Sequence, residues 1–232
     1  MSVFSSRRFQ ALAFAGAAGM LATAALAIDG EPVGPQFSDD FSAGKLSSAW
    51  VQSYKEPQFV AENGTMVGRQ INPDHGATVR VFINKTANVS FAFDAKFTGK
   101  GGFNAVIGDP DSANYTHAGH LARFSVRPKG INLSDDVEGF MKIAHRDLPK
   151  AERDAAAAPH RTDFKTEGAL NDGEWHNYRL EIRGETATLW VDGKKLGELT
   201  SDGFDHPGKT RFGFTVNGGD AIHFDNVEIA PL

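Results

Sequence analysis

Two histidines three residues apart, His117 and His120, lie in the segment THAGHLARFSVR and have the side chains best suited to acid–base chemistry. An imidazole titrates near neutral pH, so it can remove a proton, donate one or bind a metal ion. Residues three apart in a regular strand face opposite sides, so the pair converges only if the chain turns between them. Gly119 permits such a turn. HxxH outside a helix is also typical of two unrelated loop residues. We predict a catalytic pair, with the loop pair as the alternative.

Acidic residues in the segment SDDVEG follow the histidines in sequence. We predict Asp135 as a catalytic group beside His117 and His120, and Asp136 and Glu138 as ligands for a divalent metal ion. Carboxylates and imidazoles together can hold such an ion or move a proton at neutral pH. Aspartates also favour turns through local hydrogen bonds, so a plain turn between strands is the alternative. The residues leave both a metal cofactor and metal-free proton transfer open.

Basic and aromatic residues supply candidate ligand-binding groups. Arg123 and Arg127 alternate with apolar residues and are expected on an outward face, where forked guanidinium groups bind hydroxyl, carbonyl or carboxylate groups. A solvated basic stripe is the alternative. Trp190 can stack on a flat ligand ring, and His75 begins another strand that can reach the same rim. Strict alternation puts Leu121, Arg123, Ser125 and Arg127 outward, and Ala122, Phe124 and Val126 in the core.

Alternating apolar and polar residues indicate the strands that must position these groups. The alternation predicts strands over 77–85, 89–97, 103–109, 121–127, 177–184, 186–199, 210–216 and 221–230. Turns at Gly184-Glu185 and Asp192-Gly193 separate the strands near the C-terminus. Short alternating strands with regularly spaced turn signals are typical of an antiparallel sandwich. The chain is therefore predicted to be all-β, with no internal repeat and no second folded domain.

One segment, 147–158, breaks the β pattern. It reads DLPKAERDAAAA, is rich in alanine and charge, and contains no β-branched residue. These residues favour a helix that begins near Pro149 and stops at Pro159. Inserted between strands, the helix is either a surface decoration or a lid over a cleft.

The first 27 residues have the features of a signal peptide. Arg7 and Arg8 precede an apolar run rich in alanine and glycine, and a small-residue cleavage pattern ends at Ala27. We predict a signal peptide over 1–27, a lead-in over 28–36 and one domain over 37–232. The arginine pair leaves the twin-arginine route open beside general secretion. The mature protein is expected to be periplasmic or secreted, with no stable membrane insertion.

Composition excludes several classes of function. The chain has 232 residues, no cysteine and a formal net charge of −5. Disulfides, zinc–thiolate sites and a cysteine nucleophile are therefore excluded. The sequence has no basic patch that predicts nucleic-acid binding.

Three segments carry a family resemblance: FSDDFSAGKLSSAW, DGEWHNYRLEI with TLWVDGKKLGEL, and RFGFTVNGGDAIHFDNVEIAPL. With these segments the chain resembles the 3-keto-disaccharide hydrolase-like domain family. That family belongs to the concanavalin A-like superfamily and is often labelled glycoside hydrolase family sixteen-like. The resemblance implies a jelly-roll sandwich of two antiparallel sheets with a sugar site on a concave face.

Two departures limit what the resemblance implies. The family's asparagine-serine-glycine strand is absent, and FNAVIGDP stands near its place. The pattern Glu-x-Asp-x-x-Glu of retaining glucanases is also absent. Those enzymes need two carboxyl groups about 5 Å apart across the sugar bond. A classical retaining glucanase is therefore not expected.

The resemblance implies an exported carbohydrate-active enzyme that cleaves 3-keto-glycosides as a glycosidase of hydrolase or lyase type. A 3-keto group acidifies the C2 proton, so a base can remove that proton and the C1 substituent can leave. Such a site needs a base and an electrophile for the enolate, such as a metal ion or an arginine. The alternative is a non-catalytic carbohydrate-binding module, which needs only a concave face. A cell-surface interaction protein without a sugar ligand is a third interpretation. The sequence alone does not decide whether the chain is an enzyme.

Overall fold

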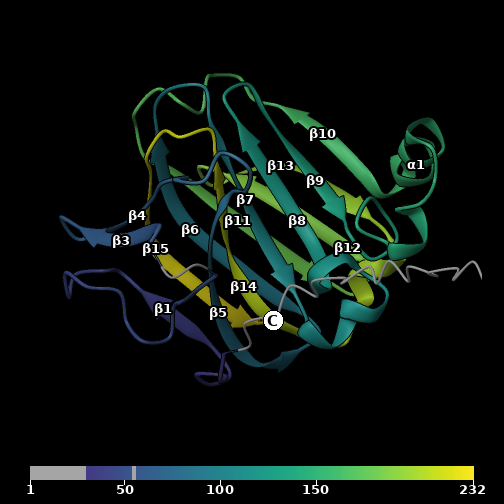
Figure 1. The fold of residues 1–232 in the computed structure, drawn as a ribbon, viewed down its shortest axis with the longest axis horizontal. Helices are drawn as coiled ribbons and strands as arrows, with labels where there is room; N and C mark the ends of the chain where they lie inside the picture. The colour runs from purple at the N-terminus through teal and green to yellow at the C-terminus, as the bar shows by residue number, and fades with distance from the viewer. Residues whose placement is uncertain (1–29, 54–55) are drawn as a thin grey trace, which may run out of the picture.

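The computed structural model describes residues 30–53 and 56–232 and consists of two antiparallel sheets packed face to face (Figure 1). Sheet A contains β1 (Phe37–Asp39), β3 (Phe59–Glu62), β4 (Thr65–Gly68), β6 (Val89–Phe97), β11 (His176–Arg183), β12 (Thr186–Val191), β13 (Lys194–Thr200) and β15 (Ile222–Pro231). Sheet B contains β2 (Val51–Gln52), β5 (Ala77–Thr86), β7 (Gly102–Gly108), β8 (His120–Arg127), β9 (Gly130–Asp135), β10 (Arg161–Lys165) and β14 (Lys209–Asn217). The predicted signal peptide, 1–27, lies outside the described residues.

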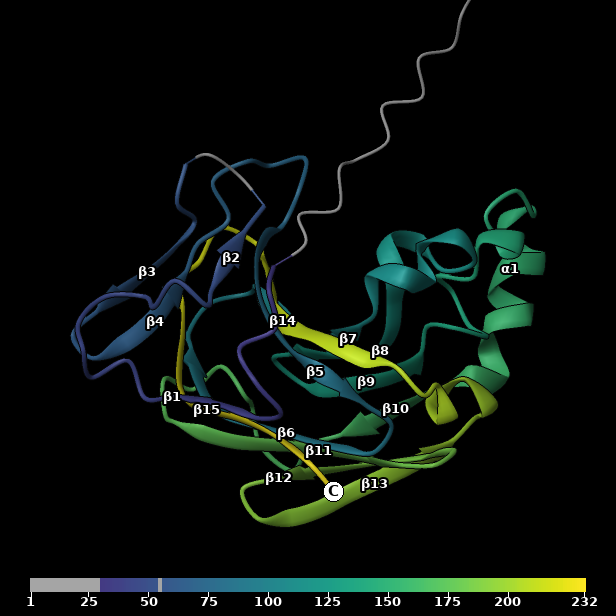
Figure 2. The ribbon, with the colours of Figure 1, turned by 90° about the horizontal axis from the view of Figure 1, so that it is seen from below.

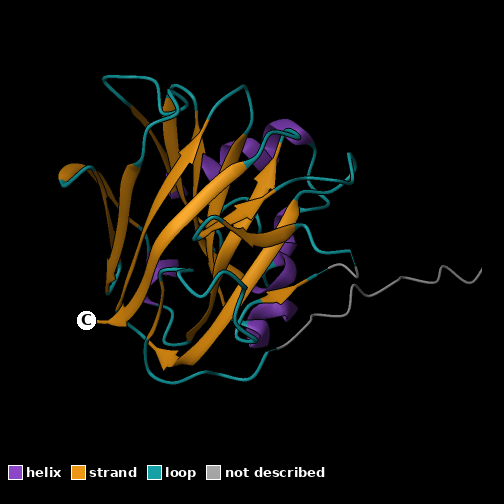
Figure 3. Ribbon diagram, turned by 90° about the vertical axis from the view of Figure 1, so that its left-hand side faces the viewer, coloured by secondary structure: helices purple, strands orange, loops and turns teal. Residues whose placement is uncertain are grey.

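The strand order is that of a jelly roll. Sheet A runs β13-β12-β11-β6-β15-β4-β3, with β1 also paired to β15, and sheet B runs β10-β9-β8-β7-β14-β5-β2. Helical segments gather mainly at one side of the two layers (Figure 3). They are α1 (Lys150–Ala157) and the 3₁₀ turns η1 (Pro110–Asn114), η2 (His117–Gly119), η3 (Ile143–His145), η4 (Ala158–His160) and η5 (Asp202–Asp205). The predicted all-β sandwich with one short helical insertion is confirmed.

Aromatic side chains fill the space between the sheets. The residues of β6 alternate between buried and half-buried from Val89 to Phe97, as the sequence predicts. Phe93 of β6 contacts Phe214 of β14 at 4.8 Å and Phe124 of β8 at 5.8 Å between ring centroids. Tyr178 of β11 stacks on Phe93 at 5.5 Å. Each fully buried aromatic contributes about 1.5–3 kcal/mol by leaving water, so these contacts hold the sheets together.

The helical insertion follows β9 and rises on the side of sheet B that faces away from sheet A (Figure 2). Pro149 caps α1 and Pro159 lies in the 3₁₀ turn that follows it, which matches the predicted start and stop. The insertion is fixed to η2, because the His117 amide donates to the Met141 carbonyl at 2.8 Å. The Ile143 amide donates to the Tyr115 carbonyl, also at 2.8 Å. The insertion therefore forms one wall beside the outer face of sheet B.

Candidate functional site

The outer face of sheet B, turned away from sheet A, carries the candidate site. Asp136, His120 and Arg123 meet there. Arg123 Nη2 donates to Asp136 Oδ1 at 3.0 Å, and His120 Nδ1 lies 3.7 Å from Asp136 Oδ2. Asp136 has no exposed surface, and the other two side chains are less than one-fifth exposed. An imidazole, a carboxylate and a guanidinium are thus packed together in a largely dry place.

A β-bulge puts His120 on this face. Ile107 pairs with Ala122, but the next residue, Gly108, pairs with His120, so Leu121 is an extra residue in β8. A bulge of this kind re-aims the neighbouring side chain. His120 consequently lies on the same face as Arg123, whereas strict alternation would separate them. The prediction that Leu121 faces outward is wrong, because the bulge buries it completely.

The turn before the bulge has a left-handed backbone. Ala118 has φ 53° and Gly119 has φ 67°. Gly119 is required here, since a Cβ at this position would overlap the carbonyl oxygen of Asp109. The turn brings the rings of His117 and His120 to 6.5 Å between centroids. The turn therefore places the two rings near each other, but only His120 is among the residues that line the adjacent hollow, and a catalytic pair stays a prediction.

The surroundings of His120 favour a neutral imidazole. Burial lowers its pKa, and the charges of Arg123 and Arg211 act in the same direction against the opposing effect of Asp136. Burial acts to raise the pKa of Asp136, but Arg123 and His120 outweigh it and the net shift is downward. An ionised carboxylate facing Nδ1 favours a proton on that nitrogen and leaves a lone pair on Nε2. This is the tautomer in which a histidine acts as a base.

His117 stands at the edge of the cluster. Arg146 Nη1 lies 3.3 Å from His117 Nδ1, and a guanidinium only donates, so this nitrogen is an acceptor. Burial lowers the pKa of His117, and the charges of Arg146 and His75 lower it further. His75, predicted as a binding residue, is exposed and lies near enough to act on His117 in this way. Both histidines are therefore neutral near pH 7.

A small hollow beside His120 contains two arginines that were not among the predicted site residues. Arg80 of β5 and Arg211 of β14 line it together with His120, Val106 and Gly213. Arg211 is almost fully buried and donates to the Ala118 carbonyl. The alternation in ATVRVFINK and TRFGFTV places both arginines outward, so this signal was present in the sequence. An imidazole and guanidinium groups therefore line the hollow together.

Arg127 lies on the outer face but outside this cluster. Its guanidinium donates to the carbonyls of Phe103 and Val126, at 3.1 and 2.8 Å. Burial and the charge of Arg123 lower the pKa of Arg127. Ligand binding by Arg127 stays a prediction.

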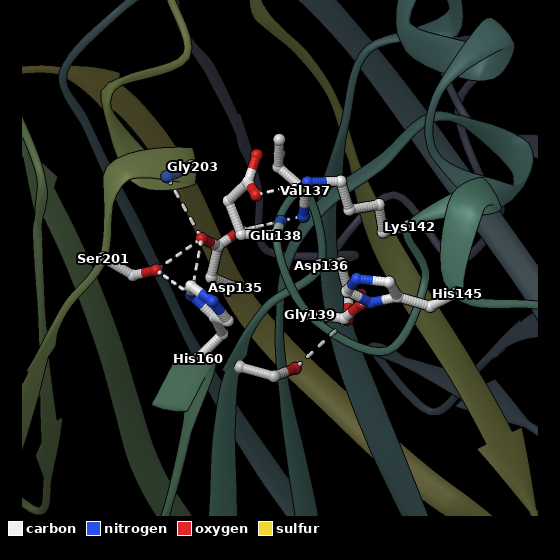
Figure 4. Close-up of polar contacts among 11 residues, drawn as sticks. Asp135, Asp136, Val137, Glu138, Gly139, Lys142, His145, His160, Ser201 and Gly203 are labelled. Carbon is white, nitrogen blue, oxygen red and sulfur yellow. Dashed lines mark hydrogen bonds and ion pairs between the residues drawn. The ribbon is translucent and has the colours of Figure 1, made fainter. Parts of the chain in front are cut away.

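Contrary to the prediction, Asp135 does not belong to the cluster around His120. It lies in a separate group of contacts with Ser201, Gly203 and His160 (Figure 4). It pairs with Ala122 across β8 and β9 and therefore faces away from Asp136. Its Oδ2 accepts from Ser201 Oγ at 2.6 Å and from the Gly203 amide at 3.1 Å. His160 Nδ1 lies 2.8 Å from the same Ser201 hydroxyl. Burial raises the pKa of Asp135 despite these bonds. Asp135 fastens the end of the insertion to η5.

Trp190 also lies away from the candidate site. It is part of β12 in sheet A, and the guanidinium of Arg179 covers its ring at 4.4 Å. The prediction that it shares a sugar-binding face with Arg123 is wrong, because the two residues belong to different sheets.

The predicted metal ligands do not converge. Asp136 accepts from Arg123, whereas Glu138 Oε2 pairs with Lys142 Nζ at 2.5 Å (Figure 4). Within residues 30–53 and 56–232, no three histidine or acidic side chains group as metal ligands. The residues therefore do not fit the predicted metal site.

The family model for the 3-keto-alpha-glucoside-1,2-lyase-like domain matches residues 37–230 of this chain. The chain belongs to this family, which makes it a carbohydrate-active, glycosidase-like domain. The predicted resemblance is thereby confirmed.

Solved structures show the same fold at low sequence identity. An endo-1,3-beta-glucanase catalytic domain from Thermotoga petrophila RKU-1 is 13% identical with a TM-score of 0.58, over 83% of this chain and 95% of that one. The carbohydrate recognition domain of Emp47p is 11% identical with a TM-score of 0.55, over 85% and 95%. A sialidase is 14% identical with a TM-score of 0.60, over 85% of this chain and 18% of its own. These likenesses confirm the concanavalin A-like jelly roll.

One curated relative matches over a short stretch. Sex hormone-binding globulin of Rattus norvegicus is 44% identical over 41 residues, which are 16% of this chain. The match spans 10% of the length of that relative. Separately, none of the helices in the described part of the chain is long and apolar enough to span a membrane.

Proposed function

We propose that this protein cleaves 3-keto-glycosides by β-elimination, with His120 as the base. The Asp136–His120 pair beside Arg123 and Arg211 is the observation that carries the proposal. A neutral imidazole held by a buried carboxylate is suited to remove a weakly acidic proton. The family description supports the substrate class.

The elimination moves one proton and breaks one bond. His120 Nε2 takes the C2 proton, and the electron pair forms an enolate with the 3-keto oxygen. Guanidinium groups around the hollow stabilise this negative charge, a task for which fixed donors in a dry site are effective. The enolate then expels the C1 oxygen substituent, which leaves as an alcohol after taking up a proton. The sugar product contains a C1–C2 double bond conjugated to the ketone, and water can add to it afterwards.

Asp136 acts as a positioning residue in this scheme. Its Oδ1 is held by Arg123, and the Ser134 hydroxyl lies 3.3 Å from the same oxygen. Its Oδ2 is left to face His120. The 3.7 Å separation is longer than a hydrogen bond, and such contacts often shorten when substrate binds. The carboxylate stabilises the imidazolium that forms as the proton is removed.

Exchange of the C2 proton with solvent tests the chemistry directly. The unmodified protein should exchange or eliminate C2-deuterated methyl 3-keto-α-glucoside, and His120→Asn should reduce the rate by ~100- to 10,000-fold. His223→Asn is the matched control, because that histidine belongs to β15 in sheet A. No C2 exchange and no cleavage by the unmodified protein would refute the proposal. Saturable sugar binding without turnover would favour the binding module.

Export is part of the same proposal. We infer that the segment 1–27 directs the chain out of the cytoplasm, where it meets its sugar substrate. The arginine pair, the apolar run and the small-residue cleavage pattern of that segment support this.

A further inference from the structure

A second hollow lies next to the candidate site, between the outer face of sheet B and the helical insertion. It measures about 210 Å³. Small-molecule sites usually measure about 300–1,000 Å³, so this hollow is small and suits a single ring better than a larger ligand. Its lining includes Arg123, Asn132, Ser134, Phe140, His160 and Arg161.

The lining combines one exposed ring with polar side chains. Phe140 belongs to the insertion and is 38% exposed, so its ring is accessible to a ligand. Arg153 covers one face of the ring, with its guanidinium 4.8 Å from the centroid, and this contact holds Phe140 in place. Asn132, Ser134 and Arg161 project from β9 and β10 on the opposite wall. A pyranose has an apolar C–H face and a rim of hydroxyls, so it matches a ring opposed by hydrogen-bonding groups.

The second hollow lies next to the first, with one buried ion pair between them. Arg123 lines the second hollow and binds Asp136, which faces His120 in the first. A ligand that contacts Arg123 in the second hollow therefore lies close to the ion pair that faces His120. In a two-ring substrate the ring that loses the C2 proton lies by His120, and the ring attached at C1 extends towards the insertion.

We propose that this second hollow is the subsite for the leaving sugar of a 3-keto-disaccharide, with Phe140 as its stacking surface. This assignment rests on the proposed function for the placement of the reacting ring. It gives the helical insertion a role, because the insertion supplies Phe140, Ala157 and His160 to the hollow. It also predicts selectivity for two-ring over one-ring substrates.

Binding of uncleavable ligands tests the subsite separately from catalysis. Replacing the glycosidic oxygen by a methylene group gives C-linked α-3-keto-glucosyl-glucose isomers that have no C1 oxygen to expel. At least one isomer should bind ~10-fold or more tightly than the one-ring C-methyl analogue, equivalent to about 1.4 kcal/mol. Phe140→Ala should abolish this difference and leave affinity for the C-methyl analogue within about twofold, as expected for one lost ring contact. Ile143→Ala, another exposed apolar residue of the insertion, should preserve the difference.

The outcomes separate the two proposals. The subsite is overturned if no C-linked disaccharide binds more tightly than the one-ring analogue, or if neither kind of ligand binds. It is also overturned if Phe140→Ala lowers the affinity for both kinds of ligand equally, or for neither. The proposed function is overturned if methyl 3-keto-α-glucoside is neither exchanged at C2 nor cleaved, even where C-linked disaccharides still show the dependence on Phe140. Thermal melting of Phe140→Ala beside Ile143→Ala shows that both variants are folded.

Discussion

Arg123 has a larger structural role than its outward-facing position in the sequence pattern indicates. An exposed arginine contributes little to stability, so the alternation of β8 alone predicts that Arg123→Ala folds normally. The structure changes this expectation, because Arg123 is the main partner of Asp136, a carboxylate with no exposed surface. Removing one member of a buried ion pair leaves the other charge uncompensated.

We therefore expect Arg123→Ala to lower the free energy of unfolding by about 3–5 kcal/mol. The double variant Arg123→Ala/Asp136→Asn should recover part of that loss, since it removes the unpaired charge. Arg127→Ala is the control and should cost about 0.5–1.5 kcal/mol, because its guanidinium donates to carbonyls at a less buried position. Urea unfolding measures all three. Equal losses for Arg123→Ala and the double variant would contradict the ion-pair explanation.

His120 links stability to pH. Its pKa is lowered from 6.5 in the folded protein, so below about pH 6.5 the unfolded chain binds a proton that the folded protein does not. This contribution to stability is present above pH 6.5 and is lost as the pH falls towards the folded pKa. We expect the free energy of unfolding to decrease more steeply between pH 7 and pH 5 in the unmodified protein than in His120→Asn. Identical slopes in a urea series would show that His120 is not buried in its neutral form.

At the scale of elements, the bulge in β8 and the turn before it decide which residues form the site. Period-2 alternation predicted the long strands and the buried face of β6, and the alanine-rich composition between two prolines predicted the helix within 147–158, because these features depend on local sequence. It failed at Leu121, since a bulge depends on how β7 and β8 pair. Strand β9 was also missed, and its pairing with β8 is what sends Asp135 inward and Asp136 outward. Residue types thus pointed to His120, Arg123 and Asp136, which meet in the candidate site, but only the pairing of β8 with β9 shows which of the two adjacent aspartates joins them.

The turn is open to a direct test through Gly119→Ala. A left-handed backbone costs a non-glycine residue about 1–2 kcal/mol, and at Gly119 the new Cβ also overlaps the Asp109 carbonyl. Gly219 has a similar φ of 79° but open space around it, so Gly219→Ala measures the backbone cost alone. We expect Gly119→Ala to destabilise the protein by at least ~1 kcal/mol more than Gly219→Ala, and to reduce turnover by moving His120. Equal melting temperatures would mean that the turn tolerates a Cβ.

At the scale of the whole molecule, the sandwich is closed at one edge by the chain that follows the predicted signal peptide. The Val33 amide donates to the Phe82 carbonyl at 2.9 Å, and the Asn84 amide donates to the Gly34 carbonyl at 2.7 Å. These bonds place the lead-in along β5, where β2 pairs with only Arg80 and Val79. An unpaired strand edge promotes association between chains, so the lead-in protects sheet B. Processing of the N-terminus must therefore leave the lead-in intact.

Cleavage after Ala27 meets this requirement, because it leaves Ile28 as the first residue and keeps the segment that pairs with β5. We expect mass spectrometry of exported protein to show a chain beginning at Ile28. A chain produced without residues 1–27 should melt at the same temperature as the exported protein. A chain produced without 1–36 should melt at a lower temperature and associate more readily, since it exposes the edge of β5. Exported protein that still begins at Met1 would contradict the signal peptide. Equal behaviour of the two shortened chains would instead contradict the protective role of the lead-in.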